Sequence, residues 1–135
     1  MGLLIRALLM WLALAAVMFA NGAVRALVWQ PRLGEHLARQ VATGLGVLIV
    51  FGFAFLFVRR LESPTNGELL GVGALWLMLT LAFEFGLGYI TGMSWEAMLA
   101  DYDIREGRLW PLIPTAALIA PWFWGAVGME RRARV

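Results

Sequence analysis

The chain has 135 residues, a net charge of +2 and no cysteine, and 61 % of its residues are hydrophobic and 15 % charged. A water-soluble domain contains about 45–50 % apolar and about 25 % charged residues, and a chain of this length cannot hide the difference from water. The composition therefore predicts a membrane protein and excludes a soluble enzyme. It also excludes disulfides and thiolate chemistry, and the basic residues, all arginine, form no patch that would bind nucleic acid.

The first apolar stretch, residues 3–28, predicts a membrane-spanning helix. Arg6 interrupts it near the start, and Asn21 and Arg25 interrupt it near the end. A positive charge, an apolar run and small residues in this order also imitate a signal peptide. We expect the segment to be retained and to span the membrane.

Three further apolar stretches predict spans over residues 41–58, 69–91 and 111–129. Thr43 is the only polar side chain of the second span, and Glu84 lies inside the third. The predicted fold is an all-α, polytopic membrane protein, a single transmembrane domain of residues 1–135 with four transmembrane helices.

The connector of residues 29–40 contains Pro31 and Gly34, which mark a turn. Glu35 and Arg39 are four residues apart, so they form an ion pair on one helical face. We therefore expect the second spanning helix to begin before the membrane.

Two other connectors are predicted, over residues 59–68 and 92–110. In the first, Asn66 and Gly67 act as helix breakers. In the second, Ser94 caps a short interfacial helix before the fourth span. Its apolar face consists of Trp95, Met98, Leu99 and Tyr102.

The arginines near the predicted helix ends suggest an orientation. Four spans place six arginines on the side of both termini and five on the other side. Arginine pairs directly follow the second span and lie at the end of the fourth, at 59–60 and 131–132. We therefore predict that both termini are cytoplasmic.

Glu84 is the most informative residue, because an ionisable side chain inside a span is costly and is usually paired or faces a cavity. We expect it to face the helix bundle and to meet Arg25 or Arg39 in a polar pocket that opens to the outside. Two interpretations remain open: a buried ion pair that holds the helices in register, and a site for a ligand, cation or proton. The candidate ligand-binding or ion-pair network consists of Glu84, Arg25, His36, Arg39, Asn21 and Gln40.

The predicted outer loop carries a second group of charged residues, Glu96, Asp101, Asp103, Arg105 and Arg108. Asp101 and Asp103 are two residues apart and would point away from each other on a helix. We interpret the group as solvated charge. With one histidine and no cysteine, the sequence predicts no metal site, no cofactor and no catalytic residues.

Glycines and tryptophans within the spans predict packing. Pairs such as Gly71 and Gly73 favour close helix approach, the alternative being backbone that lines a ligand passage. Trp11 and Trp76 lie deep in their spans, where each indole N–H needs a hydrogen-bond partner.

The run from Phe83 to Trp110, and especially AFEFGLG at residues 82–88 and SWEAMLADYDIREGRLW at residues 94–110, resembles a pattern of small uncharacterised four-helix bacterial inner-membrane proteins. Residues 21–25 and 31–35 belong to the same pattern. The resemblance covers about a third of the chain and implies a fold and a location in the bacterial inner membrane. It implies no activity.

Three functions remain in ranked order. The first is a small transporter, channel or ligand-binding protein with an outward-facing pocket around Glu84. The second is a non-catalytic accessory or assembly subunit, and the third is an intramembrane enzyme that modifies a lipid. Because four thin helices enclose little volume, we expect the lipid bilayer, further copies of the chain or another membrane subunit as partners, and no nucleic acid.

Overall fold

A computed structural model describes residues 2–100 and 111–133, and all secondary structure in this part of the chain is helical. The long helices are α1 (Leu3–Val24), α3 (Glu35–Val58), α4 (Asn66–Ile90) and α6 (Leu112–Ala133). The shorter elements are a π-helical segment η1 (Arg25–Trp29), α2 (Gln30–Leu33) and α5 (Trp95–Ala100). The prediction of an all-α fold is therefore confirmed for the described residues.

Among the residues that the structure describes, three helical segments are long and apolar enough to cross a membrane: Leu3–Leu33, Glu35–Val58 and Asn66–Ile90. The first runs through α1, η1 and α2 and is longer than the predicted span, ending only where Gly34 adopts a φ of +84°. The fourth helix contains a shorter apolar stretch, Leu112–Gly128.

The helix boundaries follow local sequence signals. Glu35 and Arg39 form the predicted ion pair at 2.9 Å at the start of α3. Asn66 and Gly67, interpreted above as breakers, instead lie in the first turn of α4. The reason is a capping box, in which the hydroxyl of Thr65 accepts a hydrogen bond from the Glu68 N–H and the Glu68 carboxylate accepts one from the Thr65 N–H.

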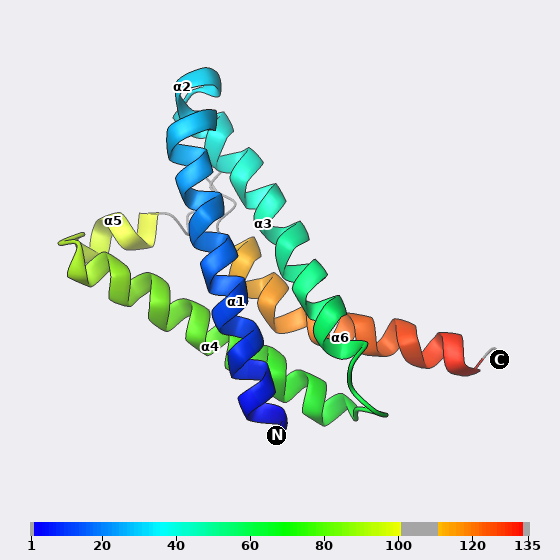
Figure 1. Ribbon diagram of the computed structural model, residues 1–135. Helices are drawn as coiled ribbons and strands as arrows, with labels where there is room; N and C mark the ends of the chain where they lie inside the picture. Colours follow the sequence, from blue (N-terminus) through cyan, green and yellow to red (C-terminus); the bar gives the residue numbers. More distant parts are fainter. Residues whose placement is uncertain (1, 101–110, 134–135) are drawn as a thin grey trace.

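The four long helices form two antiparallel pairs, α1 with α3 and α4 with α6, and the pairs cross each other (Figure 1). α6 packs closely on both α3 and α4, whereas α1 and α4 touch over a shorter length. Small residues occupy the close contacts: a Cβ added to Gly73 would collide with the carbonyl oxygen of Leu118. The core includes the fully buried side chains of Leu69, Val72 and Trp76.

The predicted short helix before α6 is present as α5. The Ala97 N–H donates to the Ser94 hydroxyl at 3.1 Å, which confirms the predicted cap. Met98 is buried against Gly88 of α4, while Trp95 remains largely exposed. α5 therefore folds back over the end of α4 (Figure 1).

Candidate functional site

The candidate site is a pocket that forms where α1 and α4 separate. Two hydrogen bonds join these helices, from Trp76 Nε1 to the Ala7 carbonyl at 3.0 Å and from Trp11 Nε1 to Thr80 Oγ1 at 3.1 Å. Trp11 lies one helical turn after Ala7 on α1, and Thr80 lies one turn after Trp76 on α4. The two bonds therefore hold the same end of the contact between these helices. Both indole N–H groups thus have the partners that the sequence requires.

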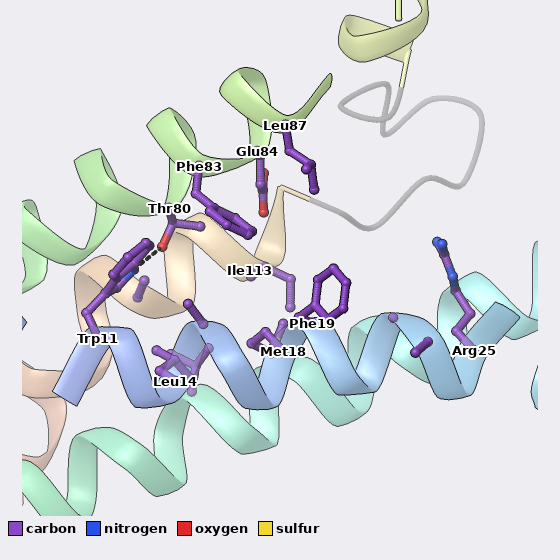
Figure 2. Close-up of a pocket in the computed structure, with 15 residues that line it drawn as sticks. Trp11, Leu14, Met18, Phe19, Arg25, Thr80, Phe83, Glu84, Leu87 and Ile113 are labelled. Atoms are coloured by element: carbon purple, nitrogen blue, oxygen red, sulfur yellow. Dashed lines mark hydrogen bonds between the residues drawn. The ribbon is translucent and has the colours of Figure 1, made fainter. Parts of the chain in front are cut away.

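Beyond the Trp11–Thr80 bond the space between the helices becomes a pocket of about 330 Å³ (Figure 2). α1 and α4 form its walls, and Val50, Ile113 and Ala117 from α3 and α6 also line it. Phe19 and Leu87 line the pocket and yet are 65 % and 41 % exposed, so the pocket opens to the surface of the bundle between α1 and α4.

Glu84 lies in the lining, as the sequence predicts for a residue that faces the bundle. Thr80, Phe83 and Leu87 line the pocket beside it because residues three and four apart share one face of a helix. Figure 2 shows the Glu84 carboxylate directed from α4 into the pocket. The side chain is half-buried.

Arg25 lines the same pocket from the other wall, at the far end from Trp11 (Figure 2). The structure thus brings together the two residues whose meeting the sequence analysis proposed, at one pocket rather than in direct contact. Apart from them and Thr80, the lining residues that the structure describes are apolar. An acidic side chain on the α4 wall and a basic side chain at the far end from Trp11, in an otherwise apolar space, suit a molecule with an apolar body and a polar group.

The helix is distorted at Arg25, the first residue of the π-helical segment η1. π-Helical turns often occur at functional sites, because the extra residue changes the direction of side chains. Arg25 Nε and Trp29 Nε1 are both buried and have no hydrogen-bond partner among the described residues. The distortion lies in the helix of Arg25 rather than in that of Glu84.

The other predicted network residues lie elsewhere. Asn21 Nδ2 donates to the Ala42 carbonyl at 2.9 Å and so fastens α1 to α3. His36 and Gln40 hydrogen-bond each other at 3.2 Å on the exposed first turns of α3. Arg39 pairs with Glu35 on the same turns. None of these four predicted residues lines the pocket; each stabilises a helix or a helix pair.

In the predicted outer loop, Glu96 is exposed on α5. Asp101, Asp103, Arg105 and Arg108 lie outside the described residues. Within the described part of the chain, no group of three or more His, Asp or Glu side chains is arranged to hold a metal ion.

The sequence gives no sign of the apolar part of the pocket, which includes Met18, Phe19 and Phe83. Apolar residues are common throughout the spans, so nothing in the sequence distinguishes those that line a cavity. A weaker signal was available for Thr80, because a hydroxyl inside an apolar stretch needs a partner and a deep tryptophan can provide one.

No protein-family model, curated protein or solved structure matches this chain. Its class is defined by its architecture: the described residues are helical, and three helical segments among them are long and apolar enough to cross a membrane.

Proposed function

We propose that this chain is an integral membrane protein with four spans and that it binds an amphipathic molecule in the pocket between α1 and α4. The observation that carries the proposal is that Glu84 and Arg25, which come from separate helices, line one pocket whose other described lining residues, Thr80 apart, are apolar. Charged side chains in a spanning segment are expensive to insert and usually serve a site.

α6 supplies the fourth span in this proposal. Its apolar stretch, Leu112–Gly128, is about 25 Å long at about 1.5 Å per residue, close to the thickness of the hydrocarbon layer. Arg6 donates to the Arg60 carbonyl at 3.2 Å, so the start of α1 and the end of α3 lie together. An arginine-rich end of this kind favours a cytoplasmic location for both termini, and we place the protein in a bacterial inner membrane.

The shape of the pocket favours binding over conduction. The bond from Trp11 to Thr80 closes its inner end, and Trp76 is completely buried beyond it. The pocket opens sideways between α1 and α4, where a bilayer would present acyl chains. An amphipathic molecule can therefore enter from the bilayer and place its polar end near Glu84 and Arg25.

The test uses a substitution that fills the pocket without disturbing the helices. A Cβ added to Gly22, which lines the pocket, meets no atom within 4 Å, so Gly22→Leu occupies the cavity. Gly52→Leu is the matched control, because Gly52 is exposed, also has free space around it and does not line the pocket. The probes are a long-chain alkylamine with a photoreactive diazirine and the matched carboxylic acid, added to the protein in detergent.

We expect probe cross-links to map to the pocket in the wild type and in Gly52→Leu. In Gly22→Leu the cross-linking should fall by about tenfold or more, which corresponds to a loss of about 1.4 kcal/mol in binding free energy. Glu84→Gln should weaken labelling by the amine, and Arg25→Gln labelling by the acid. Equal labelling of the wild type and Gly22→Leu would refute the pocket as the binding site.

The alternative is a non-catalytic subunit that assembles with copies of itself or with another membrane protein. It is favoured by the free space around Gly52, because small residues on an outer surface allow another helix to approach closely. Gly52→Leu would then break the assembly, as seen by size-exclusion chromatography, while Gly22→Leu would leave it intact.

A further inference from the structure

A second cavity lies at the arginine-rich end of the molecule. Its volume is about 690 Å³, and it is lined by the end of α3, the loop that leads to α4 and the C-terminal half of α6. In Figure 1 this region lies where the end of α3 passes beside α6. It is separate from the Glu84 pocket, with which it shares no lining residue.

The charge in this cavity is of one sign. Arg59 and Arg131 both line it, one from α3 and one from α6, and no acidic side chain is among the described lining residues. The neighbouring cavity at the same end also has two arginines, but there Glu62 and Glu68 balance them. Among the described lining residues, the larger cavity therefore presents two guanidinium groups and no carboxylate.

The rest of the lining is apolar or small and continues along the spans. The guanidinium of Arg59 lies 5.7 Å from the centre of the Phe55 ring, which holds it over the cavity in a cation–π contact. Phe55 itself is 42 % exposed and stacks edge-on with Trp124, which provides an apolar floor. Gly128 leaves space, since a Cβ there would meet no atom within 4 Å.

We propose that this cavity binds an anionic phospholipid, with the phosphate between Arg59 and Arg131 and an acyl chain against Phe55 and Trp124. Guanidinium groups bind phosphate oxygens with paired, charge-assisted hydrogen bonds. Basic pockets between spanning helices on the cytoplasmic side are where anionic headgroups bind. The inference rests on the proposed membrane location and orientation, and is independent of the ligand proposed for the Glu84 pocket.

The test uses the full chain in a mild detergent, with native mass spectrometry to count bound lipids. The probes are phosphatidylglycerol, phosphatidylcholine of the same acyl chains, and inorganic phosphate as a competitor. We expect phosphatidylglycerol to bind in preference to phosphatidylcholine. Each of Arg59→Gln and Arg131→Gln should weaken its binding by about fivefold, the effect expected for one arginine near an anionic lipid.

Two further variants separate the cavity from general surface charge. Gly128→Leu fills the cavity and keeps both arginines, so it should also reduce phosphatidylglycerol binding. Arg32→Gln removes an exposed arginine of α2, which does not line the cavity, and should leave binding unchanged. Circular dichroism and a single size-exclusion peak identify the variants that remain folded.

The inference is overturned if Gly128→Leu binds phosphatidylglycerol as the wild type does, or if Arg32→Gln weakens binding as much as Arg59→Gln. It is also overturned if inorganic phosphate displaces the lipid completely, because the ligand would then be free phosphate. Equal binding of phosphatidylcholine overturns it as well, because the cavity would then not select an anionic headgroup. Gly22→Leu should bind phosphatidylglycerol normally, so a failure of the Glu84 pocket proposal can be distinguished from a failure of this inference. A chain recovered in solution without detergent would instead contradict the membrane location.

Discussion

Gly73 and Gly71 provide the sharpest test of the packing between α4 and α6. They are two residues apart on one helix, but a Cβ at Gly73 would collide with the Leu118 carbonyl, whereas one at Gly71 would meet nothing within 4 Å. The Leu118 carbonyl carbon and Cα would lie only 2.9 and 3.2 Å away. Because these are all backbone atoms, no side-chain rotation can relieve the collision, and α6 itself has to move.

The magnitude follows from the comparison of Gly73→Ala with Gly71→Ala. Replacing glycine with alanine inside a helix gains up to about 1 kcal/mol of helix propensity at both positions, so this contribution cancels in the difference. What remains is the overpacking of Gly73→Ala, which costs about 1–3 kcal/mol. We expect a value in the upper part of this range, because α6 also packs on α3 and cannot move freely.

The assay is the free energy of unfolding in mixed micelles, measured by titration with sodium dodecyl sulfate and followed by circular dichroism. A difference of about 2 kcal/mol would shift the unfolding equilibrium about 30-fold. Equal stability of Gly73→Ala and Gly71→Ala would refute the close contact between α4 and α6, and with it the packing role of Gly73.

The same assay tests two further predictions. Trp76→Phe removes the buried hydrogen bond to the Ala7 carbonyl and part of the side-chain volume, so we expect the free energy of unfolding to fall by about 1–2 kcal/mol. The loss should be larger than for Trp124→Phe, because the bond from Trp124 to the Phe51 carbonyl is only partly buried. Equal losses would contradict this. Gly34→Ala forces a side chain into a φ of +84° and ψ of 163°, a region used almost only by glycine, and should cost about 1–3 kcal/mol. Unchanged stability would show that the turn between α2 and α3 has a different conformation.

Some parts of the candidate site were predictable from local sequence. Glu84 faces the bundle and shares a pocket with Arg25, as the cost of an ionisable side chain in an apolar stretch suggests. Asn21, His36 and Gln40 were expected at the same pocket. They instead form hydrogen bonds within or between α1 and α3, which satisfy them just as well.

The start of α4 shows how one local sequence signal can outweigh another. Asn66 and Gly67 are typical of turns, and the apolar pattern predicts a helix that starts after them. Thr65 and Glu68 have the spacing of a capping box, which satisfies the free N–H groups at a helix start. The cap therefore extends the helix over two residues that disfavour it.

The sequence alone determined the all-helical class and the apolar stretches that could span a membrane, because composition and helical periodicity are local properties. Only the tertiary structure decided which glycines pack and where the cavities lie. Gly71 and Gly73 are equivalent in sequence, but only Gly73 faces α6. Arg25 and Glu84 are far apart in the chain, and they line one pocket because two tryptophan bonds fasten α1 to α4 at one end and let them separate at the other. Cavities arise from how helices cross, and that geometry depends on contacts between distant residues.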